Sequence, residues 1–238
     1  RRAAGRAAAE VLEPGGGWVD LKIPAAEFRP QRSLEIGQCF HWKKATGHPA
    51  QWLGAVGGAA LLLREVDDTT LVRCIHGVSC VEDLRRYFSW GAHGPHLRDL
   101  YDDWARRDGL AAAAGAALPG ARAIRQDAFE ALVSFICSAN NNVPRITLTL
   151  DRLRARFGAP LGGLPHDLAA AGDPGAAKRS VHAQEFNERR AFHRFPDMES
   201  LASAEEHELR AVGLGYRARY VAGAARAALD AGGEAWLQ

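Results

Sequence analysis

The chain has 238 residues, which is enough to bury a hydrophobic core as one large domain or two smaller ones. Apolar residues make up 47% and charged residues 24%, so the composition is that of an ordered globular protein rather than a disordered one. The formal net charge is only +2, but 26 of the 30 basic residues are arginines, whose planar guanidinium groups favour bidentate hydrogen bonding. No apolar run approaches the ~20 residues of a membrane-spanning helix.

The four cysteines show neither a CxxC spacing nor a paired histidine cluster: Cys39, Cys74, Cys80 and Cys137. This pattern argues against a zinc site and predicts reduced thiols in an intracellular compartment. Residues 1–16 open with the Arg- and Ala-rich run RRAAGRAAAE. We interpret them as a flexible or truncated N-terminal arm, or as the remnant of a targeting segment.

Residues 17–115 are predicted to form an antiparallel sheet domain that also contains helices. Short runs rich in Val, Trp, Leu and Thr alternate with turn residues up to Val78: WVDLKI, QCFHW, HPAQWLGAV, AALLLREV and TTLVRCIH. Asp67-Asp68 is a predicted hairpin turn. From Val81 the spacing becomes helical in VEDLRRYFSW and HLRDLYDDWARR. The Ala/Gly-rich residues 110–119 lead into a predicted boundary turn at Leu118-Pro119-Gly120.

Residues 116–238 are predicted to be helical. Asp127 can cap the helix AFEALVSFICS, whose apolar residues suggest a wide buried face, and Asn142 can cap VPRITLTLDRLRARF, which closes at Gly158. Further helices are predicted in ESLASAEEHELRAVG and YRARYVAGAARAAL. Residues 165–194 have no sustained period, so we expect a loop or disordered insertion there.

Three consecutive asparagines, residues 140–142, interrupt the helical pattern between these two capped helices. Asparagine is a poor helix former because its amide competes for local backbone bonds, so the triplet costs stability unless the amides have other partners. An amide offers a donor and an acceptor together, which suits the edge of a nucleobase. The triplet therefore predicts a corner that binds a base.

Three segments, in this order along the chain, resemble the eukaryotic-type 8-oxoguanine DNA glycosylases and abasic-site lyases of the helix-hairpin-helix superfamily. They are LEIGQCFHWK (34–43), IRQDAFEALVSFICSANNNVPRI (124–146) and VGLGYRARYVAGAARAAL (212–229). The resemblance implies an α+β fold. It places a sheet domain like that of the TATA-binding protein over residues 17–115 and an incomplete helical glycosylase domain over residues 116–238.

The resemblance also implies a function in base excision repair. The substrate would be double-stranded DNA containing oxidised guanine, with 8-oxoguanine opposite cytosine flipped out of the helix before its glycosidic bond is cleaved. Neither a metal nor a cofactor is implied. We expect a monomer with no membrane partner, located in the nucleus, or in mitochondria if the N-terminal run is a transit remnant. On this reading the 165–194 insertion is either a solvated segment or an extra DNA-contacting loop.

The resemblance assigns recognition roles to five residues. Gly37 is implied to read the lesion: 8-oxoguanine carries a proton on N7 where guanine has a lone pair, and a nearby glycine carbonyl can accept a hydrogen bond only from the lesion. Asn140, Arg145 and Arg217 are implied to hold the orphaned cytosine. Tyr216 is implied to insert its ring into the base stack as a wedge.

Each of these residues also has a purely structural interpretation. Gly37 could be a strand-end or bulge glycine, and Arg145 could form a surface salt bridge. Tyr216 could be a core residue, and Asn142 is explained by capping in any case. Phe135 could line the lesion pocket, but a phenylalanine on a helix face more often belongs to a core.

No catalytic residue is assigned within the chain. In the family a nucleophilic lysine and a later aspartate follow the segment that matches AWLQ, so we expect both beyond Gln238. Lys43 and Lys44 are predicted to be solvated, and Lys178 lies in the insertion. Two functions therefore compete: part of a bifunctional glycosylase and lyase, or a non-catalytic damaged-DNA-binding module. A protein-interaction domain with chance similarity is a third alternative.

Overall fold

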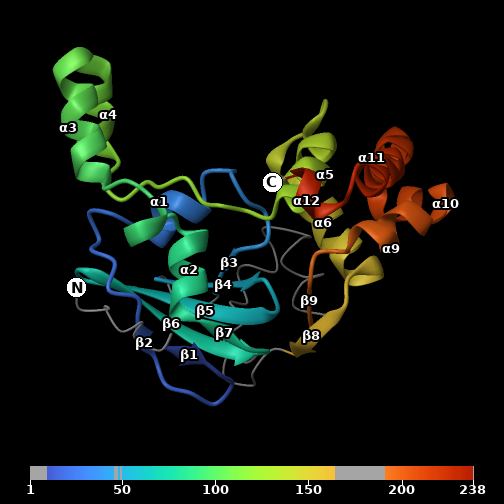
Figure 1. Ribbon diagram of the computed structural model, residues 1–238, viewed down its shortest axis with the longest axis horizontal. Coiled ribbons are helices and arrows are strands. Elements are labelled where there is room, and N and C mark those ends of the chain that lie inside the picture. Colours follow the sequence, from blue (N-terminus) through green and yellow to red (C-terminus); the bar gives the residue numbers. More distant parts are fainter. Residues whose placement is uncertain (1–9, 46–47, 49, 164–190, 238) are drawn as a thin grey trace, which may run out of the picture. The chain divides into compact units, whose positions relative to one another are not determined.

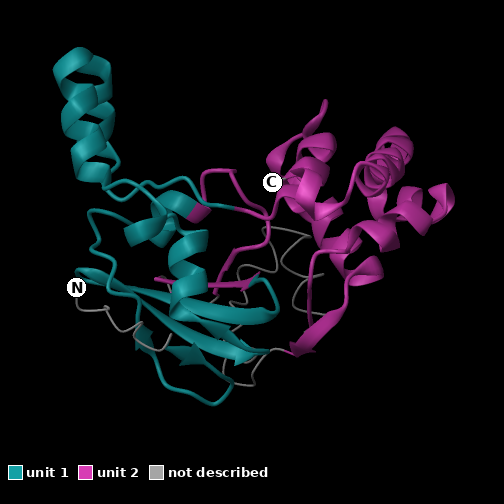
Figure 2. Ribbon diagram, viewed as in Figure 1, with its two compact units in different colours: residues 1–33, 56–125 teal, residues 34–55, 126–238 magenta. Residues whose placement is uncertain are grey.

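The computed structural model describes residues 10–45, 48, 50–163 and 191–237 and confirms the α+β class (Figure 1). The chain forms two compact units (Figure 2). Unit 1 comprises residues 1–33 and 56–125, and unit 2 comprises residues 34–55 and 126–238. This division differs from the boundary near residue 115 that the sequence suggested, because the segment with Gly37 belongs to the helical unit.

The largest sheet is antiparallel at each pairing the structure defines and has the strand order β2-β6-β5-β4-β3. Its strands are β2 (Val19–Asp20), β3 (Lys43–Lys44), β4 (Gln51–Val56), β5 (Ala59–Val66) and β6 (Thr69–His76). The predicted hairpin turn at Asp67-Asp68 is confirmed, since Val66 and Thr69 face each other at the end of the β5–β6 ladder. The prediction of a strand over QCFHW is wrong: the strand begins only at Lys43.

The remaining elements of unit 1 are mostly helical. A short ladder joins β1 (Val11–Leu12) to β7 (Ser79–Cys80). The helices are α1 (Pro30–Leu34), which ends at the unit boundary, α2 (Val81–Tyr87), η1 (Gly91–His93), α3 (Leu97–Arg107) and α4 (Gly109–Ala117). Helix α4 precedes the predicted turn at Leu118 and packs against α3 (Figure 1). The hydrophobic periodicity did not predict α4, because a run of Ala and Gly has no alternation of polar and apolar residues.

Unit 2 is built on α5 (Ala128–Ser138) and α6 (Val143–Phe157), and both predicted N-caps are confirmed. The Asp127 carboxylate accepts the Glu130 N–H at 2.8 Å, and the Asn142 amide oxygen accepts the Arg145 N–H at 3.0 Å. Gly158 ends α6 as expected. The later elements are α9 (Met198–Ser203), α10 (Glu206–Leu209), the π-turn η2 (Arg210–Leu214), the 3₁₀ turn η3 (Gly215–Arg217), α11 (Ala218–Asp230) and α12 (Glu234–Leu237).

A short ladder joins β8 (Pro160–Gly163) to β9 (Ala191–His193). The predicted loop or insertion over 165–194 is therefore wrong for residues 191–193, which pair as a strand. Residues 165–190 of that prediction lie outside the described residues.

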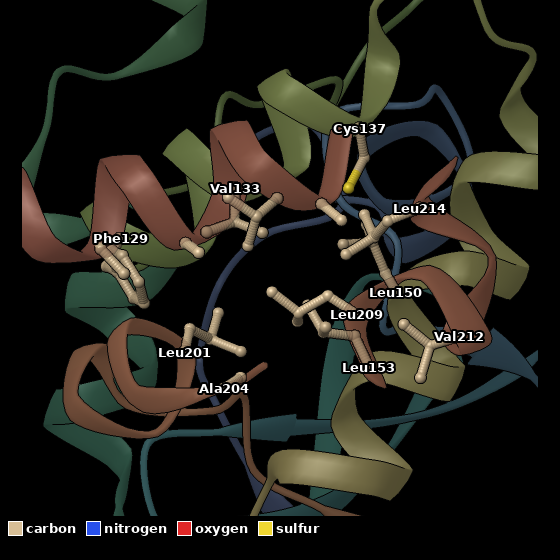
Figure 3. Packing of buried hydrophobic residues seen from close by; sticks show 14 of the residues in the cluster. Phe129, Val133, Cys137, Leu150, Leu153, Leu201, Ala204, Leu209, Val212 and Leu214 are labelled. Atoms are coloured by element: carbon tan, nitrogen blue, oxygen red, sulfur yellow. The ribbon is translucent and has the colours of Figure 1, made fainter. Parts of the chain in front are cut away.

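The core of unit 2 joins one face of α5 to α6, α9, α10 and α11. Figure 3 shows Val133, Leu150, Leu201 and Leu209 converging from four of these elements. Phe135 is not part of this core, because residues two apart on a helix lie about 200° around its axis and Val133 points inward. In the described part of the chain, no helix combines the length and apolarity needed to cross a membrane.

Candidate nucleic-acid interface

The loop between α5 and α6 uses its three asparagines differently. The Asn141 side chain donates to the Cys137 carbonyl at 2.9 Å, and Asn142 caps α6. Asn140 has a φ of +47°, a left-handed conformation that asparagine tolerates better than most residues. Its side chain is exposed and has no hydrogen-bond partner among the described residues. Two amides thus build the corner, and the third is available to a ligand.

Arg217 braces this corner from a distant part of the chain. Its guanidinium donates from Nε to the Ala139 carbonyl at 3.0 Å and from Nη2 to the Asn140 carbonyl at 3.0 Å, and Nη2 also reaches the Ala139 carbonyl. Arg217 is only 5% exposed. The role predicted for it at the cytosine stays a prediction, because in this structure its donors are directed at the backbone that places Asn140.

Tyr216 directly precedes Arg217 and lies in a turn whose backbone conformation favours glycine at two positions. Gly213 and Gly215 have φ values of +100° and +58°, a region that favours glycine. The Tyr216 hydroxyl donates to the Ala139 carbonyl at 3.3 Å, and the ring lies 4.5 Å from the guanidinium carbon of Arg217. The side chain is still 47% exposed, so the core interpretation of this tyrosine is wrong.

Arg145 lies in the first turn of α6, close in sequence to Asn140. It is exposed, and the described part of the chain offers it no ion-pair partner. Arg156, which lies about three turns further along the same helix and is also exposed, is instead paired with Glu208. The salt-bridge interpretation of Arg145 therefore finds no support among the described residues.

Phe135 precedes the asparagine triplet on α5 and is 77% exposed. The expectation that a phenylalanine on this helix belongs to the core is wrong. Asn140, Arg145, Tyr216 and Phe135 thus present an amide, a guanidinium and two aromatic rings from neighbouring elements of unit 2. These are the group types that contact bases and phosphates.

Gly37 lies on a separate segment of the same unit, in a bend before β3. It is exposed, its φ is +83°, and a Cβ built on it would meet no atom within 4 Å. The bulge interpretation is wrong because Gly37 is not in a strand. Its backbone is open to a ligand, and another residue at this position would be strained by the positive φ rather than by a clash.

A buried charged cluster was missed by the sequence analysis. The Glu130 carboxylate on α5 contacts His41 Nδ1 at 3.0 Å and Arg154 Nη2 at 2.5 Å, and accepts from Gln126 Nε2 at 3.0 Å. Burial alone would raise the pKa of Glu130, but Arg154 and His41 together hold it well below its usual range. The available signal was a glutamate inside the apolar run AFEALV, beside the buried Phe129.

Lys43 belongs to the same region, and the prediction that it is solvated is wrong. Its ammonium group pairs with Asp151 of α6 at 2.9 Å and donates to the Phe40 carbonyl at 2.9 Å. Burial lowers the pKa of Lys43, and the Asp151 carboxylate opposes that shift. Lys44, the next residue, is exposed as predicted.

The buried cysteine thiols are expected to have low reactivity. All four cysteines are free. Burial raises the pKa of Cys39 to about 12 and that of Cys137 to about 11, so neither is a nucleophile at neutral pH. The described residues contain no group of three or more His, Cys, Asp or Glu side chains that could hold a metal ion.

Known proteins of similar structure share this architecture. MBOgg1 in complex with a low-affinity DNA ligand matches with a TM-score of 0.69 and 23% identity, over 93% of this chain and 66% of that one. The Clostridium acetobutylicum 8-oxoguanine glycosylase/lyase, in complex with double-stranded DNA containing cytosine opposite 8-oxoguanine, matches with a TM-score of 0.66 and 18% identity, over 90% and 66%. The fold is therefore that of the 8-oxoguanine glycosylases.

Sequence comparison makes the assignment specific. Residues 20–132 match the family model described as 8-oxoguanine DNA glycosylase, N-terminal domain. The Arabidopsis thaliana N-glycosylase/DNA lyase OGG1 is 30% identical over 231 residues, which cover 92% of this chain and 54% of the relative. The family model and both curated relatives thus make this chain similar to the 8-oxoguanine DNA glycosylases. It spans about half the length of the curated relatives it matches.

Proposed function

We propose that this chain provides the damage-recognition part of a base excision repair glycosylase. It would bind double-stranded DNA, extrude 8-oxoguanine that lies opposite cytosine, and support removal of the base and cleavage at the abasic site. We further propose that it acts as a monomer and in the nucleus, as its expected substrate suggests.

The observation that carries this proposal is the corner at Asn140. Its amide and the Arg145 guanidinium are exposed and have no hydrogen-bond or ion-pair partner among the described residues, while Arg217 holds the loop beneath them. An unpaired cytosine presents one donor and two acceptors on its pairing edge, which an amide and a guanidinium group can satisfy. Tyr216 stands beside this position with an exposed ring that could fill the vacated stack.

Gly37 supports the same proposal from the side of the damaged base. Its open backbone would allow a carbonyl to approach N7 of the flipped base, where only 8-oxoguanine carries a proton. A hydrogen bond that the lesion makes and guanine cannot is worth about 1–3 kcal/mol in a desolvated pocket.

A non-catalytic damaged-DNA-binding module is the second candidate. The environments of the described lysines favour this candidate, because strand cleavage needs a desolvated amine that is free to attack the sugar. Among the described lysines, Lys43 is paired with Asp151, while Lys22 and Lys44 are exposed. In the glycosylase proposal the nucleophile comes from sequence outside this chain.

Equilibrium binding to three otherwise identical duplexes tests recognition. We expect the wild-type chain to prefer 8-oxoguanine opposite cytosine over guanine opposite cytosine and over 8-oxoguanine opposite adenine. Arg145→Ala should weaken binding to the preferred duplex by about 5- to 100-fold, as expected for losing one good base contact. Arg156→Ala removes the same charge from the same helix, but at a paired site, and should cost less than about threefold. Equal effects of the two variants would refute the proposed contact.

Borohydride trapping separates the two candidate functions. Reduction captures a Schiff base between an enzyme amine and the abasic sugar as a covalent adduct. A chain that prefers the lesion but yields no adduct is a binding module in isolation. An adduct would show that this chain already contains a nucleophile, against our expectation.

A further inference from the structure

Charged and polar side chains attach the segment that carries Gly37 to the helices of unit 2. The recognition mechanism proposed above gives these side chains no role. Two contacts lie within six residues of Gly37: His41 to Glu130 of α5, and Lys43 to Asp151 of α6. We call the contacts of Glu130 with His41 and Arg154, together with the Lys43–Asp151 ion pair, the charged clamp. Phe40, the residue before His41, packs against the hydrophobic core of unit 2.

The clamp is sheltered from water, which makes it strong and directional. The side chains of His41, Glu130 and Arg154 are at most 11% exposed. Arg154 also lies 5.2 Å from the centre of the Phe195 ring. Lys43 and Asp151 are less than a quarter exposed, and the same ammonium group holds the Phe40 carbonyl. Pairs this shielded are weakly screened by salt and lose their geometry only at high cost.

Gly37 is exposed, but the chain is attached on both sides of it. Before Gly37, Leu34 is buried and the Glu35 carboxylate accepts a hydrogen bond from Trp52 Nε1 at 2.7 Å. After Gly37, residues 39–43 are held by the clamp and by the burial of Cys39 and Trp42. The clamp therefore fixes the C-terminal side of Gly37 and contributes to the direction of its carbonyl. Displacing a reacting or recognising group by about 1 Å can cost up to 100-fold in an enzyme site.

We propose that the charged clamp positions the Gly37 carbonyl and thereby sets how strongly the protein distinguishes 8-oxoguanine from guanine. His41, Lys43, Glu130, Asp151 and Arg154 are positioning residues in this proposal and contact no DNA. The proposal rests on the proposed function, because it assumes that Gly37 faces the lesion.

The test uses the ratio of affinities for duplexes with 8-oxoguanine and with guanine opposite cytosine. Lys43→Met keeps the length of the side chain but removes the pair with Asp151, and should lower this ratio at least fivefold. Asp151→Ala should lower it similarly. The two variants should change the affinity for undamaged DNA in opposite directions, because one removes a cation and the other an anion. Lys43→Arg can keep both contacts and should retain the wild-type ratio.

Lys44→Met is the matched control. Lys44 is the neighbouring residue in β3 and pairs with Glu35 at 3.5 Å at an exposed site, without touching α5 or α6 through that pair. Glu35 lies two residues before Gly37, but its carboxylate keeps the shorter hydrogen bond from Trp52 Nε1, at 2.7 Å, when Lys44 is replaced. Its loss should weaken binding to both duplexes equally and leave the ratio unchanged. Hydrogen exchange of residues 37–41, measured without DNA, should quicken in Lys43→Met and stay unchanged in Lys44→Met.

The outcomes are distinguishable. A wild-type chain without lesion preference refutes the proposed function. A wild-type preference that Lys43→Met leaves intact, or that Lys44→Met lowers as much, overturns the clamp. Should Asp151→Ala fail to fold, Lys43→Met and Lys43→Arg still decide, because Arg154 Nη1 lies 4.0 Å from Asp151 and remains as its partner in both.

Discussion

Replacing Glu130 with glutamine should strongly destabilise the protein although the change is isosteric. The substitution leaves Arg154 buried without its closest counter-charge and removes the anion that contacts His41. Breaking a buried ion pair by neutralising one partner costs about 3–5 kcal/mol. Asp151 lies 4.0 Å from the other Arg154 nitrogen and compensates part of the loss, so we expect about 3 kcal/mol, near the lower end.

Urea denaturation followed by circular dichroism measures this loss. Glu206→Gln is the control: Glu206 pairs with Arg210 at 2.6 Å, but both side chains are more than half exposed. Such surface pairs contribute at most about 1 kcal/mol. A loss in Glu130→Gln no larger than that in Glu206→Gln would refute the reasoning from burial.

The pH dependence gives a second check on the same residue. The pKa of Glu130 is held below its usual range in the folded state, so the unfolded chain binds a proton at higher pH than the folded chain. The stabilisation from Glu130 is therefore complete above about pH 5, beyond the ordinary glutamate pKa, and is lost as the pH falls further. Wild type should lose stability on acidification more steeply than Glu130→Gln, and parallel curves would contradict this.

Three further changes separate structural from recognition roles. Asn142→Ala removes the cap of α6 and should cost about 1 kcal/mol in urea denaturation, whereas Asn140→Gly, which removes the amide but tolerates the positive φ, should leave stability within about 0.5 kcal/mol yet weaken lesion binding. Arg217→Met should cost about 2–4 kcal/mol in the same denaturation measurement, because the Ala139 and Asn140 carbonyls lose a charged donor, and a smaller effect would argue against the brace. Alkylation of the native protein at pH 8 should be slow at Cys39 and Cys137, whose pKa values burial raises to about 12 and about 11; rapid modification mapped to either by mass spectrometry would show that they are not sheltered.

Local rules predicted much of the fold. The Asp127 and Asn142 caps, the Asp67-Asp68 turn and the end of α6 at Gly158 follow from residues within one turn of each other, and the structure confirms them. Two local predictions were wrong. The apolar run QCFHW predicts a strand that does not form, and periodicity predicts no helix at α4 because its Ala-rich sequence lacks alternating polar and apolar residues.

Burial was less accessible to sequence reasoning. The apolar run predicts a buried face that includes Phe135, but α5 turns Phe135 toward solvent. Lysines are usually solvated, but Lys43 is largely buried beside Asp151. Glu130 shows the same difficulty. A charged residue can be buried only where others compensate it, and its partners His41 and Arg154 are remote in sequence.

The sequence by itself determined which residues serve the proposed interface: the triplet, the GLGYR turn and the GQCFHW segment were all identifiable in the printed chain. Tertiary structure decided what each of them does. Arg217 reaches the Ala139 and Asn140 carbonyls across 78 and 77 positions, and these contacts hold the loop while leaving the Asn140 side chain exposed to a ligand. The physical reason is that side-chain type fixes which bonds a residue can make, whereas only the folded chain fixes which partners are near enough to make them.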